Sequence, residues 1–212
     1  DSGVAACGAS GEVNTDPKLR LQPDSSRFTW AKFLEDVVAR HGDRCAIRFE
    51  GRDISRVQLQ ADARCLARAL AASGVSKGMR VAVHMANRPE FAVASFAIAM
   101  LGAVLVPVNT FATPQEREYI LRHSDSALLL FQRTLLKHNF LEELLQLLPE
   151  LSETGDGPLH SIRTPQLRQV VALGLQETQG RVQAWDTFLE RGSEFPDAVL
   201  DALTAAVFPA AD

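Results

Sequence analysis

The sequence predicts an α/β fold, a largely parallel sheet layered with helices. With 212 residues, 46% of them hydrophobic and 23% charged, the chain is long enough and apolar enough to bury a core. Short apolar runs of strand length alternate with helical patterns, and the connections between them are short. This alternation is typical of parallel sheets, whose strands are covered on both faces and are therefore apolar throughout.

Composition and charge exclude several classes of protein. The net charge is −4, so no basic excess exists to neutralise a phosphate backbone, and we expect no nucleic-acid partner. Cys7, Cys45 and Cys65 fit the reduced thiols of a cytoplasmic protein better than a disulfide framework. Residues 1–27 carry Gly, Ser, Asp and Pro but lack the apolar core of a signal peptide, which predicts a flexible tail.

The first ordered elements follow this tail. A helix is predicted over Phe28–His41, with apolar residues on one side and Gly42 at its end. Cys45–Phe49 is predicted as a strand. Gly51-Arg52 is predicted as a turn that leads into a short extended segment at Asp53-Ile54.

A second helix is expected to begin after Ser55, because Ser55 with Gln58 three residues later matches a capping box. Gly74 ends this helix, and Arg80–Met85 forms the next strand. The buried stripe of the helix recurs at helical spacing, at Leu59, Ala63, Leu66 and Leu70. Cys65 lies in the same helix and is interpreted as a packing residue rather than a nucleophile.

The next helix and strand come from a long uncharged run. Asn87 is predicted to cap a helix over Phe91–Leu101, and Ala103–Val106 is predicted to form a buried strand. The run Phe91–Gln115 has no charged residue, so its length also fits a membrane span. Because Gly102 interrupts the apolar stretch and a proline closes it, we expect a soluble domain without a transmembrane segment.

The same pattern continues along the chain. Thr113 is predicted to cap a helix that runs to about His123, with Glu116 completing a capping box. The further expected elements are a strand at Ala127–Phe131, a helix at Leu135–Leu148, an exposed segment at Glu150–Gln166, a strand at Leu167–Leu173 and a helix at Val182–Arg191. We assign residues 28–191 to one α/β subdomain and residues 192–212 to a connecting segment.

Motifs for phosphate and metal chemistry are missing from the sequence. A P-loop needs Gly before Lys, and the four lysines instead follow Pro17, Ala31, Ser76 and Leu136. No H-E-x-x-H, paired C-x-x-C or G-x-S-x-G motif occurs, and the five histidines are widely spaced. Gly155 and Gly157 begin a G-x-G-x-x-G pattern, but His160 occupies the third glycine position, so we interpret the segment as a surface turn.

The carboxyl ends of the predicted strands carry no acidic residue. A phosphoacceptor receiver domain would need carboxylates there, whereas this chain has His84, Asn87, Val108 and Asn109. His84 is interpreted either as a packed or solvated residue at a strand end, or as one wall of a ligand crevice. We assign no catalytic, cofactor-binding or metal-ligating residue.

Several strings, in this order and spacing, resemble the N-terminal region of adenylate-forming (AMP-binding) enzymes, which include acyl- and aryl-CoA synthetases, luciferases and nonribosomal adenylation domains. The strings are Gly74–Val81, Asn87–Phe91, Gly102–Asn109, Thr113–Glu116, Tyr119–Leu121, Leu167–Val171 and Trp185–Leu189. Met79 and Arg56 depart from the family, which usually has Asp and an aromatic residue at these positions. The Val-Pro-Val-Asn-Thr-Phe string and the long Leu135–Leu148 segment look more like CoA ligases than peptide-synthetase domains.

The resemblance implies adenylation of a carboxylic acid by ATP, followed by transfer of the acyl group to CoA. ATP, Mg²⁺ and CoA would be the cofactors of the full-length enzyme, with the acid and the remaining synthetase domains as partners. The family's phosphate loop would begin shortly after Asp212. Thr154-Gly155-Asp156 echoes its ribose-binding string, but in the wrong place.

Two hypotheses about function result. The first is that the chain is the first portion of a carboxylate–CoA ligase, inactive by itself and with no cofactor bound. The alternative is a stand-alone interaction or regulatory module that uses the same fold without catalysis.

Overall fold

The computed structural model describes residues 28–155 and 157–208, so the predicted tail at residues 1–27 lies outside the described residues. Its centre is a five-stranded sheet in the order β4-β3-β5-β8-β9, in which every neighbouring pair is parallel. The strands are β3 (Arg80–His84), β4 (Val104–Pro107), β5 (Leu128–Gln132), β8 (Gln169–Leu173) and β9 (Val182–Ala184). The prediction of a largely parallel α/β fold is therefore confirmed.

Both faces of the sheet are buried at its inner strands β3, β5 and β8, which explains their unbroken apolar runs. The prediction of a buried strand is wrong for β4, because this strand lies at the edge of the sheet and its Val104 is 47% exposed. Along β5, Leu128 and Leu130 pack into one core cluster, whereas Leu129 and Phe131 pack into a second cluster on the opposite face. All four side chains are buried. The alternation of a strand thus divides its apolar residues between two cores.

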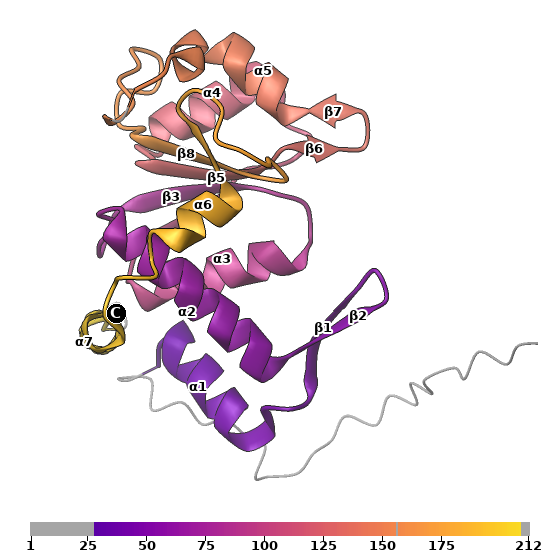
Figure 1. Cartoon of the computed structure of the whole chain (residues 1–212), viewed down its shortest axis with the longest axis vertical. Coiled ribbons are helices and arrows are strands. Elements are labelled where there is room, and N and C mark those ends of the chain that lie inside the picture. The colour runs from indigo at the N-terminus through magenta and orange to yellow at the C-terminus, as the bar shows by residue number, and fades with distance from the viewer. Residues whose placement is uncertain (1–27, 156, 209–212) are drawn as a thin grey trace, which may run out of the picture.

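The first core lies between the sheet and the helices α2 (Arg56–Ala72), α3 (Pro89–Met100) and α6 (Trp185–Glu190). Helix α1 (Trp30–His41) packs outside this layer against α2 and α3, and α7 (Asp197–Ala205) contacts α2. Figure 1 shows these helices on one side of the sheet.

The second core lies beneath α4 (Pro114–His123), α5 (Phe140–Leu147) and a 3₁₀ turn at Pro149–Ser152. These elements cover the other side of the sheet (Figure 1). Helix α4 carries the predicted cap in full: Thr113 Oγ1 accepts from the Glu116 amide, and the Glu116 carboxylate accepts from the Thr113 amide at 2.7 Å. Its boundaries therefore agree with the prediction.

A hairpin precedes α2 where the sequence predicts a strand and a short extension. Strands β1 (Cys45–Phe49) and β2 (Arg52–Ser55) pair antiparallel. Glu50 and Gly51 form the turn with positive φ values of 49° and 77°. An ion pair of 2.6 Å between Arg48 and Asp53 joins the two strands across it.

The prediction of one helix over Leu135–Leu148 is wrong at its start. Strands β6 (Thr134–Leu135) and β7 (His138–Asn139) form a small antiparallel hairpin before α5. Leu136 lies in the turn with φ 53° and is 88% exposed. This apolar residue fits the helical pattern of the sequence, but it is not part of the core. Asn139 then caps α5 by accepting from the Glu142 amide.

The predicted helix Val182–Arg191 also begins with a strand. Val182 and Ala184 are buried and belong to β9, the edge strand beside β8, and α6 starts only at Trp185. Three residues are too few for strand periodicity to be distinguished from a helical turn.

Two predicted caps differ from the structure. Helix α3 starts after Arg88 rather than Asn87 and has no side-chain cap bond; Arg88 instead pairs with Glu90. At α2, Ser55 accepts from the Gln58 amide, as predicted, but the Gln58 side chain donates to Asp62, so half of the capping box forms. Smaller differences lie at strand and helix ends: α1 begins at Trp30, β4 at Val104 and β8 at Gln169.

The long uncharged run is divided between α3 and β4, as predicted. Over the described ranges 28–155 and 157–208, no helix combines the length and the apolar character needed to cross a bilayer.

Candidate functional site at the carboxyl edge of the sheet

The strand order places a topological switch between β3 and β5. From β3 the chain crosses to β4 on one side, whereas from β5 it continues to β8 on the other side. The two strands are direct neighbours, with His84 opposite Phe131 at their carboxyl ends. In open α/β sheets, ligands bind outside the carboxyl ends of the strands at such a switch. We therefore take this edge as the candidate functional site.

Gln132, the last residue of β5, joins the two loops that diverge at the switch. Its side-chain oxygen accepts from the Ala86 amide at 2.7 Å, and its side-chain nitrogen donates to the Thr134 carbonyl at 2.7 Å. Gln132 is 4% exposed, so both bonds are shielded from water. The loop after β3 and the hairpin after β5 are thereby held in fixed positions, which is the preorganisation that a ligand site requires.

His84, the last residue of β3, is a packed residue, in agreement with the first of its two interpretations. It is 3% exposed, and its ring centroid lies 4.3 Å from that of Phe140. Burial lowers the pKa of His84 to about 4, and the nearby Arg117 charge acts in the same direction, against Glu143 and the Asn109 backbone. The imidazole is therefore neutral at pH 7, and its Nε2 has no hydrogen-bond partner among the described residues.

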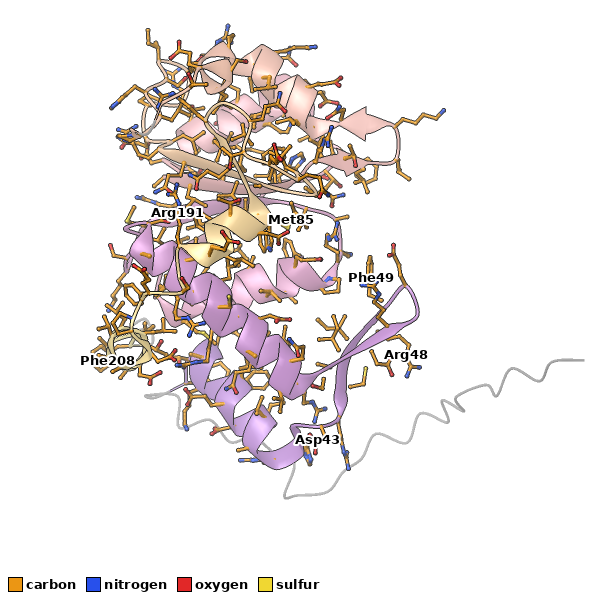
Figure 2. The ribbon with its side chains drawn as sticks, in the orientation of Figure 1. Asp43, Arg48, Phe49, Met85, Arg191 and Phe208 are labelled. Carbon is orange, nitrogen blue, oxygen red and sulfur yellow. The ribbon has the colours of Figure 1, made fainter. Side chains whose placement is uncertain are left out.

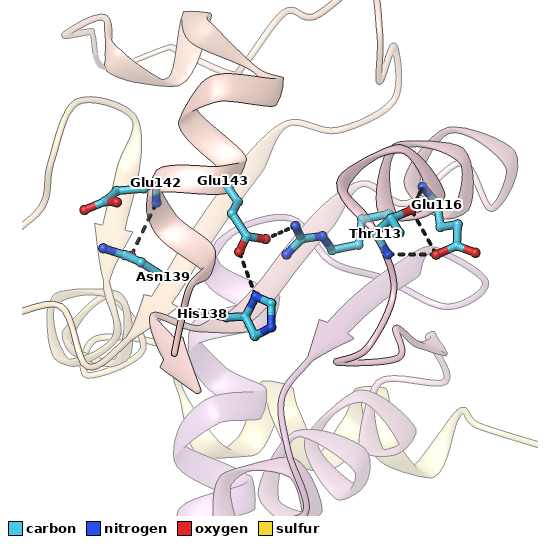
Figure 3. Close-up of polar contacts among 7 residues, drawn as sticks. Thr113, Glu116, His138, Asn139, Glu142 and Glu143 are labelled. Atoms are coloured by element: carbon cyan, nitrogen blue, oxygen red, sulfur yellow. Dashed lines mark hydrogen bonds and ion pairs between the residues drawn. The ribbon is translucent and has the colours of Figure 1, made fainter. Parts of the chain in front are cut away.

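Next to His84, a charged side chain from α4 meets two polar side chains from the β7–α5 segment. Arg117 is 6% exposed; it forms an ion pair with Glu143 and lies over the Phe140 ring, 5.2 Å from its centroid. Glu143 also contacts His138 Nδ1 at 3.1 Å (Figure 3). Burial acts to raise the pKa of Glu143, but the hydrogen bonds from Arg117 and His138 outweigh it and lower that pKa. This network holds α4 against α5 above the switch.

The loop after β4 presents an aromatic side chain at the same edge. Asn109 Oδ1 accepts from the Phe111 amide at 2.9 Å, and the Asn109 carbonyl accepts from the Ala112 amide at 3.0 Å. Phe111 is 84% exposed, although the backbone around it is fixed by this turn and by the Thr113 cap. Sequence reasoning placed Asn109 at a strand end and included Phe111 only as the last residue of the Val-Pro-Val-Asn-Thr-Phe string, without a role, because an exposed aromatic residue has no pattern of its own.

A cavity of about 360 Å³ lies beside this edge, on the α2–α3 side of the sheet. It is enclosed by the β1–β2 hairpin, by α2 and by the first residues of α3 and α6. Its polar lining includes the ion pair of Arg88 and Glu90, with contacts of 2.6 and 3.1 Å, and its apolar lining includes Trp185. Cys65, predicted to pack within α2, is half-buried and lines the same cavity.

The arrangement of this edge suits the binding and orientation of a ligand. It offers a neutral, buried imidazole, fixed loops, an exposed aromatic ring and a half-polar cavity. Among the described residues, no group of three His, Cys, Asp or Glu side chains converges in a way that could hold a metal ion. Gly155, Gly157 and His160 lie in an exposed loop and line neither this cavity nor the switch, and Asp156 lies outside the described residues.

Comparison with known proteins identifies the family. The AMP-binding enzyme family matches residues 34–186. The Bacillus subtilis protein YngI, whose name assigns it to the acyl-CoA synthetases, is 33% identical over 160 residues, which is 74% of this chain and 29% of YngI. A crotonobetaine/carnitine–CoA ligase of Salmonella typhimurium is 34% identical over 100 residues, 45% of this chain and 19% of the ligase. The chain thus spans less than a third of the length of these relatives.

Solved structures agree on the fold. The anthranilate CoA ligase AuaEII, in complex with anthranoyl-AMP, has a TM-score of 0.64 at 22% identity and covers 80% of this chain, which matches 29% of that protein. A Rhodopseudomonas palustris protein, whose title assigns it to the long-chain-fatty-acid CoA ligases, gives the same TM-score and identity, over 80% of this chain and 37% of its own. From the parallel sheet, its helical layers and the family match over most of the described residues, we conclude that the chain belongs to the AMP-binding enzyme family.

Proposed function

We propose that the chain is the N-terminal part of an ATP-dependent carboxylate–CoA ligase. In the first half-reaction a carboxylate oxygen of the acid attacks the α-phosphorus of ATP and displaces pyrophosphate, which gives an acyl adenylate. In the second, the CoA thiol attacks the acyl carbon, loses its proton and releases AMP. The observation that carries the proposal is the family match over residues 34–186, together with relatives named as CoA ligases and synthetases.

Within that enzyme, we assign the carboxyl edge of this sheet to the wall of the acid and CoA crevice. Phe111 and Trp185 provide apolar surface for an acyl chain or aromatic acid, and the Arg88–Glu90 pair provides a polar lining. Gln132 and the Arg117–Glu143 pair keep these surfaces in place. Preorganised binding of this kind contributes by fixing the reacting groups in position.

The residues present do not fit the triphosphate and Mg²⁺. The sequence has no Gly-Lys pair to face the phosphates, and the described part has no cluster of three potential metal ligands. We therefore assign the handling of ATP and Mg²⁺ to residues outside this chain. The cytoplasmic location stays a proposal, based on the odd and sparse set of three cysteines.

Acid-dependent exchange of labelled pyrophosphate into ATP tests the proposal. A longer chain that contains these residues and a downstream T-S-G-T-T-G-x-P-K-G-like loop should catalyse exchange only when a carboxylic acid is present. The 212-residue chain should show no exchange above the acid-free control. A longer chain that folds but fails to exchange with any of a panel of aliphatic and aromatic acids would contradict the proposal.

A further inference from the structure

A small internal cavity of about 10 Å³ lies between the sheet and the helices α4 and α5. Its apolar wall consists of residues of the second core: Val108, Leu121, Leu129, Phe131, Phe140 and Leu144. Two polar residues, His84 and Arg117, complete the lining, and every lining residue is buried. Figure 2 labels Met85, the residue after His84, and so shows where this end of β3 lies. The 360 Å³ cavity is on the other face of the sheet, because its buried apolar residues belong to the first core.

The imidazole of His84 has one nitrogen with a partner and one without. A hydrogen bond with the Asn109 backbone acts to raise the pKa of His84, so the ring is the donor and the Asn109 carbonyl is the acceptor. Nε2 is shielded from solvent and has no hydrogen-bond partner in the described part of the chain. We therefore assign the proton of the neutral ring to Nδ1. Nε2 is then a buried acceptor that lacks a donor.

Arg117 has donors to spare beside the same cavity. A guanidinium group has five N–H donors, and Arg117 donates from Nη2 to Glu143. His84 and Arg117 both lie beside the Phe140 ring: the His84 ring centroid is 4.3 Å and Arg117 Cζ is 5.2 Å from the Phe140 centroid. Within residues 28–155 and 157–208, no hydrogen bond joins Arg117 to His84 Nε2. A charged donor and an unsatisfied acceptor thus line one cavity without direct contact.

We propose that this cavity binds one water molecule, which bridges His84 and Arg117. The water donates a hydrogen bond to His84 Nε2 and accepts one from the Arg117 guanidinium. The volume is near the lower limit of roughly 10–15 Å³ that one water needs, and a buried water needs at least about two polar partners. The cavity is too small for a larger ligand. Immobilising one water costs less free energy than leaving a buried acceptor unsatisfied.

The water completes a chain of hydrogen bonds across the carboxyl edge of the sheet. The chain runs from Asn109, in the loop after β4, through His84 and the water to Arg117 in α4. It continues through Glu143 to His138 in the β7–α5 segment. Three segments around the topological switch are linked in this way, and His84 is a positioning residue for them. The water needs neither ATP, acid nor CoA, so this inference does not rest on the ligase proposal.

Magnetic relaxation dispersion of the water signal tests the site, because it counts the long-lived internal waters of the 212-residue chain. Val108→Ile adds a methylene group to the wall of the cavity and should displace the water, so the count should fall by one. Val93→Ile, which adds the same group at a buried residue lining the 360 Å³ cavity, is the matched control and should leave the count unchanged. A count that is equal in the parent chain and in Val108→Ile would overturn the proposal.

Two measurements on the parent chain test the same site without a variant. A high-resolution crystal structure should show one water within roughly 3.2 Å of both His84 Nε2 and an Arg117 nitrogen. Nitrogen NMR of the imidazole should show the proton on Nδ1 at neutral pH. An empty cavity, a direct bond from Arg117 to His84, or a protonated Nε2 would overturn the proposal. None of these results bears on pyrophosphate exchange, so the ligase proposal is tested separately.

Discussion

At the scale of single residues, the buried His84 makes the stability of the chain depend on pH. Its folded pKa of about 4 lies below the usual value near 6.5, so between these values the unfolded chain binds more protons than the folded one. The stabilisation is fully present above pH 6.5 and is lost as the pH falls toward 4. The free energy of unfolding should be about 2 kcal/mol lower at pH 5 than at pH 7 through this residue alone.

Urea unfolding at both pH values measures this difference. His84→Gln, which cannot titrate, should reduce the pH dependence by the same amount, although it also lowers stability at pH 7. Gln166→Ala, at an exposed position and without a titratable group, is the control and should leave the pH dependence unchanged. A pH dependence that is the same with and without His84 would show that this imidazole is not buried in the neutral form.

Some residue-scale features could be predicted from the sequence and others could not. The position of His84 at a strand end follows from the apolar run before it, but its burial depends on Phe140, which is distant in the sequence. The Arg117–Glu143 pair depends on α4 and α5 packing together, and no local pattern reports that contact. Phe111 is an apolar residue on the surface, where hydrophobic periodicity gives no signal.

At the scale of elements, side-chain caps mark the first residues of α1, α2, α4 and α5. Thr113→Ala removes the side-chain acceptor of the Glu116 amide and should lower the free energy of unfolding by about 1 kcal/mol. Asn87→Ala should change it by less than about 0.3 kcal/mol, since Asn87 is exposed and is not the cap of α3. Chemical denaturation measures the free energy of unfolding of both variants. Equal losses of stability would show that Asn87 caps α3.

A glycine substitution at Leu136 should change stability in opposite directions for the β6–β7 hairpin and for a continuous helix. Leu136 has a positive φ and an exposed side chain, so Leu136→Gly relieves an unfavourable backbone conformation and should raise stability by about 0.5 kcal/mol. If Leu135–Leu148 were one continuous helix, the same change would lower stability by about 1 kcal/mol. Thermal or urea unfolding of Leu136→Gly distinguishes the two, with Leu136→Ala as the reference variant.

The elements that sequence reasoning assigned incorrectly are the short ones. Helices α2 and α4 and strands β3 and β5 were predictable because caps, glycines and apolar runs agree over many residues. Strands β6, β7 and β9 have two or three residues each, and their pairing partners decide their conformation. In β9, the parallel register with β8 supplies what the local sequence does not specify.

At the scale of the whole molecule, the sheet separates two regions of different chemistry. The carboxyl edge has fixed loops, an aromatic side chain and a half-polar cavity, and we assign it to the acid and CoA crevice of a ligase. The amino edge has three arginines around a polar hollow. The fold class could be predicted from alternating patterns, whereas both regions depend on residues that only the tertiary fold brings together.

We propose that this chain provides a platform and that the ATP-handling groups of the ligase lie outside its 212 residues. Isothermal titration of Mg-ATP into the 212-residue chain tests this most directly. We expect no saturable binding up to about 1 mM ATP. The sequence has no Gly-Lys pair to hold the phosphates, and the described residues have no cluster of three potential ligands to hold the metal. A dissociation constant in the micromolar range would contradict it.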